Sequence, residues 1–151
     1  MSRSILSAAK AEIRAGAREI GGNNRGPFVA KYLAPSGLRP PQPWCAAFAS
    51  WCLLRSTRKH ELPDLPYFLS AREMFNWAKA GRMLREAPMP GHLMFFSRGG
   101  IFSWKGHCGI VVSASRSRIV TIEGNRTSRV QTFEYSAATV SNFLGFAGII
   151  S

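Results

Sequence analysis

The sequence predicts an α+β fold, with helices in the first part of the chain and antiparallel strands in the second. Before Pro90, apolar residues recur at helical spacing, and segments rich in Gly and Pro separate them. After Pro90 the pattern changes to short runs of β-branched and aromatic residues bounded by Gly, Ser and Arg. Helices first and strands later are typical of an α+β domain, in which helices pack on a sheet.

The first helix is predicted from Ile5 to Ile20, because apolar residues recur there at intervals of three or four. Gly21 and Gly22 would end it. Its basic face could lie on a membrane, but packing against its own domain is the commoner use of such a helix. A loop rich in Gly, Pro and Asn follows from Gly21 to Pro43, with a short helix over Phe28 to Leu33.

Two more helices have clear starting points. Pro43 precedes an Ala-rich apolar run, which predicts a buried helix that begins near Cys45. After a loop from Leu62 to Pro66, Ser70 and Glu73 form a capping box, and Gly81 closes the helix that they start.

Four strands are predicted in the second part of the chain. They cover residues 93–96, 108–112, 119–122 and 143–150. A hairpin through residues 113–117 would set the second and third strands side by side.

Length and composition indicate one ordinary globular domain over residues 1–151. Twenty Lys and Arg against eight Asp and Glu give a net charge of +12, with the basic residues spread along the chain. This charge favours anionic partners such as nucleic acid, anionic lipid or the phosphate-rich polymers of a bacterial envelope. Three cysteines do not suggest a disulfide framework, and unpaired thiols suit folding in a reducing cytoplasm.

Cys45 is a candidate nucleophile because of its position. The free N–H groups at a helix start stabilise a thiolate and can also bind an oxyanion. A cysteine in an apolar run is, however, commonly a buried core residue, and the position alone does not exclude this.

A nucleophilic cysteine needs a base and a group that orients it. His107 enters a predicted strand between two glycines, whereas His60 lies in a charged loop and His92 starts another strand. Glu123 and Asn125 end the strand after that of His107, so the predicted hairpin would bring one of them near His107. This favours His107 over His92.

At these residues the sequence resembles the CHAP family, the cysteine- and histidine-dependent amidohydrolases and peptidases. The resemblance rests on four segments in order: residues 19–27 (EIGGNNRGP), residues 43–52 (PWCAAFASWC), residues 106–111 (GHCGIV) and residues 122–125 (IEGN). It implies a papain-like fold and hydrolysis of amide bonds in peptidoglycan. Carried over to this chain, Cys45 is the nucleophile, His107 the general base and then acid, and Glu123 the group that orients His107, with Asn125 in support.

The chain departs from the family in two places. Many relatives have Gly-Asp where this chain has Gly91-His92. Some bind calcium through an Asp-rich loop, but residues 23–25 and 42–44 hold no carboxylate, so no calcium, other metal or cofactor is expected. Trp44, Asn23 and Trp104 are candidates for the substrate groove, although core packing is the ordinary role of a tryptophan such as Trp44.

With this resemblance, we expect a bacteriolytic thiol hydrolase: an N-acetylmuramoyl-L-alanine amidase or a stem-peptide or cross-bridge endopeptidase. It would act as a bacteriophage lysin, either an endolysin or a virion-associated lysin. The positive charge would attract anionic envelope polymers. No apolar run is long enough to span a membrane, and Met1 to Ile20 lacks the profile of a secretory signal. The enzyme would therefore be made in the cytoplasm and reach the cell wall after release or delivery.

Two alternatives remain. An interbacterial toxin effector would use the same chemistry. A basic nucleic-acid- or envelope-binding protein without activity would explain the charge, but the chain has no recognisable nucleic-acid module.

Overall fold

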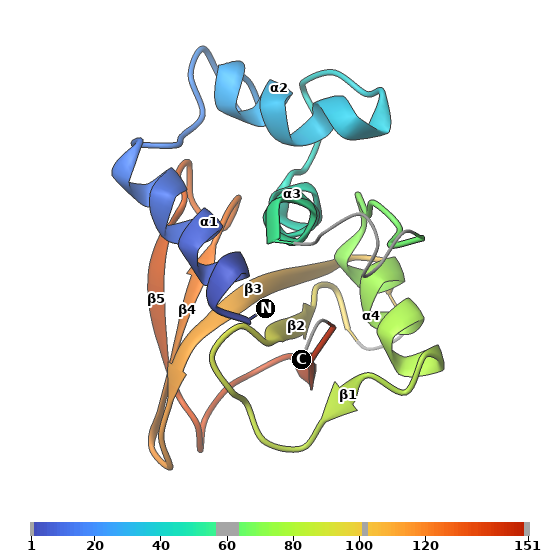
Figure 1. Cartoon of the computed structure of the whole chain (residues 1–151), viewed down its shortest axis with the longest axis vertical. Helices are drawn as coiled ribbons and strands as arrows, with labels where there is room; N and C mark the ends of the chain where they lie inside the picture. Colours follow the sequence, from blue (N-terminus) through green and yellow to red (C-terminus); the bar gives the residue numbers. More distant parts are fainter. Residues whose placement is uncertain (1, 57–63, 101–102, 150–151) are drawn as a thin grey trace.

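The computed structural model describes residues 2–56, 64–100 and 103–149, with side chains from Ile5 onward. His60, the first two residues of the predicted loop (62 and 63) and the end of the last predicted strand at Ile150 lie outside these residues. The described parts form an α+β fold in which helices pack on an antiparallel sheet (Figure 1). The predicted fold class is therefore confirmed.

The helices are α1 (Ser2–Arg14), α2 (Pro27–Leu33), α3 (Cys45–Ser56) and α4 (Ala71–Ala80), with a short 3-10 turn over Ala34–Ser36 after α2. Three of them start as the sequence predicts. Pro27 occupies the first turn of α2. The Ser70 side chain caps α4 by accepting a hydrogen bond from the Glu73 N–H.

The predicted end of the first helix is wrong, because α1 stops at Arg14 and not at Ile20. Gly16 adopts a left-handed conformation with φ 71°. The Gly16 N–H then bonds to the Ile13 carbonyl and the Ala17 N–H to the Glu12 carbonyl, which is the Schellman arrangement that ends helices. The apolar periodicity continues to Ala17 because that side chain is also buried, although it lies outside the helix.

The sheet has six strands in the order β1-β6-β2-β3-β4-β5, and neighbouring strands are antiparallel. Their bounds are Leu84–Arg85 (β1), Leu93–Ser97 (β2), Gly106–Ala114 (β3), Arg118–Glu123 (β4), Gln131–Ser136 (β5) and Phe143–Ala147 (β6). The predicted hairpin between β3 and β4 is present, with Ile110 opposite Ile122. The strands β1 and β5 were not predicted.

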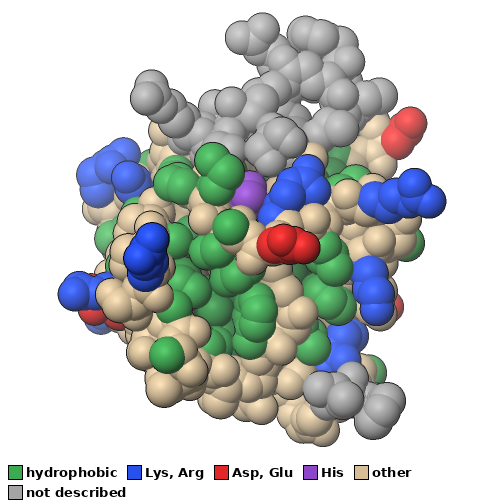
Figure 2. Space-filling view, turned by 90° about the horizontal axis from the view of Figure 1, so that it is seen from below, with side chains coloured by type: hydrophobic (Ala, Val, Ile, Leu, Met, Phe, Trp, Pro, Cys, Tyr) green, Lys and Arg blue, Asp and Glu red, His purple; other side chains and the backbone are tan. Residues whose placement is uncertain are grey.

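Helices α1, α3 and α4 lie on one side of the sheet (Figure 1), and the main core fills the space between them and the strands. A smaller apolar cluster, made by Met94, Phe96, Val111, Ile119 and Phe146, lies apart from that core. Figure 2, which shows the molecule from below, has hydrophobic side chains at the centre of that face and separate Lys and Arg side chains around it. The positive charge on this face is thus dispersed, as it is along the sequence.

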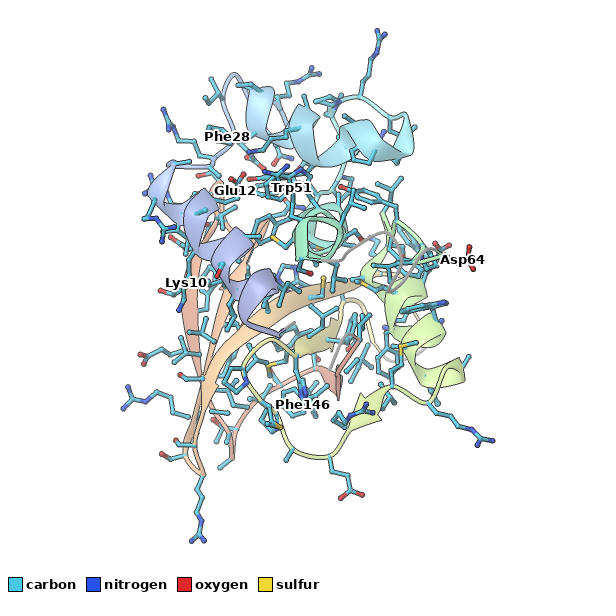
Figure 3. All side chains as sticks on the ribbon, in the orientation of Figure 1. Lys10, Glu12, Phe28, Trp51, Asp64 and Phe146 are labelled. Atoms are coloured by element: carbon cyan, nitrogen blue, oxygen red, sulfur yellow. The ribbon has the colours of Figure 1, made fainter. Side chains whose placement is uncertain are left out.

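A buried acid joins the three N-terminal helices. Glu12 of α1 is 6% exposed and accepts hydrogen bonds from the Tyr32 hydroxyl, at 2.5 Å, and from Lys31 of α2. The Lys31 ammonium also lies 4.7 Å from the ring centre of Trp51 on α3, in the region where Glu12, Phe28 and Trp51 are labelled in Figure 3. Buried charges need such partners, so this contact fixes the position of α3 relative to α1 and α2.

Candidate active site

Cys45 is the first residue of α3, and its side chain is 7% exposed. The first backbone bond of the helix runs from the Phe48 N–H to the Trp44 carbonyl. The N–H groups of Cys45, Ala46 and Ala47 therefore have no partner within the helix, and they give this end of α3 a partial positive charge. A thiolate at this position is stabilised electrostatically.

His107 lies at the start of β3, opposite Phe96 of β2, and is 4% exposed. Its Nε2 is 2.7 Å from the Oε1 atom of Glu123. The ring also shares a hydrogen bond with the Cys45 side chain. His107 thus connects the helix that carries Cys45 with the strand that carries Glu123.

Glu123 ends β4 and is completely buried. Besides His107, its carboxylate accepts hydrogen bonds from the Thr121 hydroxyl at 2.5 Å and from the Tyr135 hydroxyl at 2.6 Å. The strand β3 leaves room for this carboxylate because residue 109 is glycine: a Cβ atom there would lie 2.6 Å from the Glu123 Cγ. The carboxylate is therefore held in one position, as a group that orients a histidine must be.

The pKa of the Cys45 thiol lies well below its ordinary value. The largest contribution is a hydrogen bond with Cys108, and the hydrogen bond and charge of His107 add to it, so that together they outweigh the opposing effect of burial. The Cys108 thiol has a pKa well above its ordinary value, chiefly through the same hydrogen bond. Cys108 consequently stays protonated and donates to the Cys45 thiolate.

The His107 imidazole has its pKa raised to about 9. Burial is the largest single contribution and lowers the pKa, but hydrogen bonds and charges from Cys45 and Glu123 together outweigh it. For Glu123, burial would raise the pKa, yet the hydrogen bonds with His107, Thr121 and Tyr135 lower it below its ordinary value. The directions of these pKa shifts favour a thiolate, an imidazolium and a carboxylate in a row.

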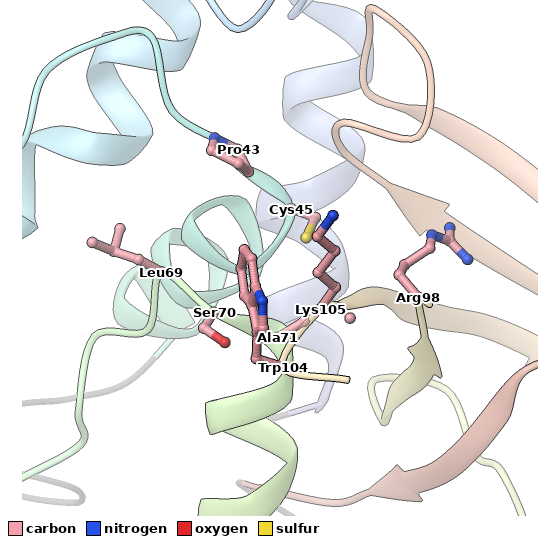
Figure 4. Close-up of a pocket in the computed structure, with 9 residues that line it drawn as sticks. Pro43, Cys45, Leu69, Ser70, Ala71, Arg98, Trp104 and Lys105 are labelled. Carbon is pink, nitrogen blue, oxygen red and sulfur yellow. The ribbon is translucent and has the colours of Figure 1, made fainter. Parts of the chain in front are cut away.

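A pocket of about 270 Å³ opens beside Cys45 (Figure 4). Part of its wall is apolar, with Pro43, Leu69 and Ala71, and part is basic, with Arg98 and Lys105. The lining residues are Pro43, Cys45, Leu69, Ser70, Ala71, Arg98, Trp104, Lys105 and Gly106. A thiolate next to a proton donor at the edge of such a pocket can attack the carbonyl carbon of a bound amide and protonate its leaving amine.

The structure does not bring all the predicted groove residues to this pocket. Trp104 lines it and is 77% exposed. Trp44 is completely buried, stacks on Tyr32 and donates from Nε1 to the Glu19 carboxylate, so its predicted place in the groove is wrong. Asn23 is exposed on the loop before α2 and is not part of the lining.

Asn125 follows Gly124 after β4 and has a left-handed backbone with φ 63°. Within the described chain, the hydrogen-bond partners of the His107 ring are Cys45 and Glu123, and Asn125 is not among them. In place of Asn125, it is Thr121 and Tyr135 that hold Glu123. His92 lies at the other end of β2, where its Nδ1 accepts a hydrogen bond from the Met89 N–H.

Sequence reasoning missed Tyr135 and Cys108 as members of the site. Tyr135 is on the unpredicted strand β5. It pairs opposite Ile119 of β4, four residues before Glu123, and its hydroxyl reaches the Glu123 carboxylate at 2.6 Å. Cys108 and Cys52 are both buried, but only Cys108 of the two shares a hydrogen bond with Cys45. The signal available for Cys108 was its position next to His107.

No group of three or more His, Cys, Asp or Glu side chains in residues 2–56, 64–100 and 103–149 is arranged to hold a metal ion. Within the same residues, no helix combines the length and apolar character that crossing a bilayer requires.

Comparison with known families gives one match. The sequence model of the CHAP domain matches residues 38–125, which include Cys45, His107 and Glu123 and cover more than half of the chain. No curated protein matches the chain. The strand β5, with Tyr135, lies beyond the matched residues. From this match and the α+β fold, we conclude that the chain belongs to the CHAP domain family, papain-like hydrolases that act as cysteine- and histidine-dependent amidohydrolases or peptidases.

Proposed function

We propose that this protein hydrolyses an amide bond of peptidoglycan, with Cys45 as the nucleophile, His107 as the general acid and base, and Glu123 as the group that orients His107. The single observation that carries the proposal is the continuous contact of these three side chains at the start of α3, beside a pocket. The family match, in turn, supports the hydrolase class.

In the first half of the reaction, the Cys45 thiolate attacks the carbonyl carbon of the amide. The free N–H groups at the start of α3 stabilise the negative charge that forms on the carbonyl oxygen. The His107 imidazolium gives its proton to the leaving amine as the C–N bond breaks. The products of this half are the free amine and a thioester between the acyl group and Cys45.

In the second half, His107 is neutral and acts as a base. It takes a proton from a water molecule that attacks the thioester carbonyl. Breakdown of the second tetrahedral intermediate releases the carboxylic acid and restores the Cys45 thiolate beside the His107 imidazolium. Glu123 keeps the ring in position throughout, because its own place is fixed by Thr121 and Tyr135.

The proposal covers residues 1–151 as one catalytic domain. The helix α1, outside the family match, packs on α3, and β5 pairs along the whole of β4 and supplies Tyr135 to Glu123. We also propose that the enzyme acts on the cell wall as a phage lysin, after synthesis in the cytoplasm. A net charge of +12 supports attraction to anionic envelope polymers.

The test is digestion of purified peptidoglycan, with mass spectrometry of the released fragments. An amidase creates a free lactyl carboxylate on the sugar and a free L-Ala amine, whereas an endopeptidase creates an amine within the stem or cross-bridge. We expect Cys45→Ala to release nothing and Cys52→Ala, a thiol buried away from His107, to act like the wild type. The proposal is wrong if the wild type creates no new end groups or if Cys45→Ala creates as many.

A further inference from the structure

Arg98 lines two pockets of the structure. It lines the pocket that contains Cys45, and it also lines a second pocket of about 280 Å³. The remaining walls of the second pocket are mostly polar: Phe96, Arg126, Glu134, Tyr135, Ser136, Thr139, Ser141 and Asn142. Arg98 thus stands at the border of both pockets, and Figure 4 shows it at the edge of the pocket beside Cys45.

The hairpin that carries His107 also positions Arg98. Ser97 is opposite Gly106 at the end of the β2–β3 pair, and the Arg98 N–H bonds to the Lys105 carbonyl just beyond it. Arg98 and Lys105 thus face each other across the hairpin, two residues outside the pair formed by Phe96 and His107. The backbone of these two basic residues is therefore fixed relative to His107.

These cations are not neutralised by the protein. Within the described chain no carboxylate pairs with Arg98, Lys105 or Arg126, and the first pocket has no acid in its lining. Lys105 lies over the ring of Trp104, and Arg126 donates to the Tyr135 hydroxyl. Glu134, the acid of the second pocket, faces the exposed Arg118. Both pockets therefore present positive charge to a ligand.

We propose that Arg98 binds a carboxylate of the substrate close to the scissile amide, so that the enzyme selects acidic peptides whose carboxylate is free over those in which it is amidated. This inference rests on the proposed peptidoglycan hydrolysis and names the substrate class within it. A guanidinium offers parallel N–H donors that match a carboxylate in a two-bond geometry, which an amide cannot accept in the same way. Lys105 lines the first pocket but not the second. Its ammonium group attracts a carboxylate but cannot form the parallel two-bond geometry of a guanidinium.

The experiment compares two preparations of soluble peptidoglycan fragments that are freed of phosphate-containing polymers. One keeps its carboxylates, and in the other they are converted to carboxamides with ammonia, so that every amide bond of the first is present in the second. We measure kcat and KM for the wild type, Arg98→Gln and Arg116→Gln. Arg116 is an exposed residue of the β3–β4 hairpin and lines neither pocket, so the two variants lose the same charge.

We expect the wild type to prefer the free carboxylates by about 10- to 100-fold in kcat/KM, the size of a charged hydrogen-bonded pair. Arg98→Gln should lose this preference through a higher KM for the free fragments, with no change for the amidated ones. Arg116→Gln should keep it.

Three results overturn the inference. The wild type could cleave both preparations equally. The two arginine variants could lose preference to the same extent, in which case the overall charge of +12 is responsible. Arg98→Gln could lower kcat on both preparations, which would indicate a structural role. Absence of any cleavage by the wild type contradicts the proposed function itself, so that failure is distinguishable from the other three.

Discussion

The two described histidines flank opposite ends of β2: His92 directly precedes this strand, and His107 of β3 pairs with Phe96 near its end. Their exposed fractions are similar, but their surroundings differ. His107 is 4% exposed and lies between Cys45 and Glu123, and its pKa is raised to about 9. His92 is 3% exposed, accepts a hydrogen bond from the Met89 backbone and lies near Arg85. Burial, followed by the charge of Arg85, lowers the pKa of His92.

The comparison teaches that burial alone does not make a histidine suited to acid–base catalysis. Burial opposes the protonated form of both rings. Only His107 has a buried carboxylate and a thiolate beside it, and these partners reverse the effect. The lowered pKa favours the neutral form of His92, and its Nδ1 accepts a hydrogen bond from the Met89 N–H in the turn before β2. The difference between the two sites can be tested by variants at each end.

The largest effect is expected at the histidines themselves. His107→Ala removes both the proton donor and the base, and we expect kcat/KM to fall by about 10⁴-fold or more. His92→Ala should change kcat/KM by less than about threefold, although it leaves a small cavity and lowers thermal stability. Initial rates on peptidoglycan and a melting curve measure both quantities. Comparable losses of activity in the two variants would show that the wrong histidine has been chosen.

A smaller effect is expected at Glu123, where the pH dependence is informative. In the wild type, the thiolate and the imidazolium coexist above the lowered pKa of Cys45 and below the pKa of His107, about 9. The profile of kcat/KM should therefore be bell-shaped, with its alkaline limb near pH 9 set by loss of the His107 proton.

Cys45 and Glu123 both raise the His107 pKa. Glu123→Gln removes the contribution of the carboxylate charge, so the alkaline limb should move to lower pH, and the rate should fall by about 10²- to 10³-fold. His92→Ala is the control and should leave both limbs in place. An alkaline limb that stays near pH 9 in Glu123→Gln would contradict the assigned role of the carboxylate.

The smallest effect is expected at Tyr135, which acts on His107 through Glu123. Tyr135→Phe removes one hydrogen bond to the buried carboxylate, and we expect a rate loss of about tenfold. The alkaline limb should move in the same direction as in Glu123→Gln but by less. Tyr67→Phe is the matched control, because the Tyr67 hydroxyl donates to the Tyr32 and Ala47 carbonyls. If the two tyrosine variants have identical pH profiles, Tyr135 is only a structural residue.

Much of this arrangement could be predicted because the signals are local. The proline before Cys45 and the capping box at Ser70 act within one turn, so the helix starts were correct. The β3–β4 hairpin was also predicted, and its register aligns the strands of His107 and Glu123.

The rest depended on contacts between distant segments. The strand β5 alternates between partly buried and exposed residues, which gives a weak pattern in the sequence. The Tyr135 hydroxyl bonds to Glu123 although Tyr135 pairs opposite Ile119, and Trp44 is buried where it packs on Tyr32. The helix α1 ends early because Gly16 adopts a left-handed backbone angle. The spacing of apolar side chains does not predict this angle.

The position of the Glu123 carboxylate depends on the absence of a side chain at Gly109. This glycine has no acid, base or nucleophile to contribute, yet an added methyl group would occupy the position of the Glu123 side chain, 2.6 Å from Cγ. The carboxylate would then have to leave His107, and the ring would lose one of the two partners, Cys45 and Glu123, that raise its pKa. The histidine and the glycine two residues after it thus form one unit, in which one residue supplies the reactive ring and the other supplies the volume that the ring's partner fills. Any side chain larger than that of glycine at position 109 would therefore displace the carboxylate on which His107 depends.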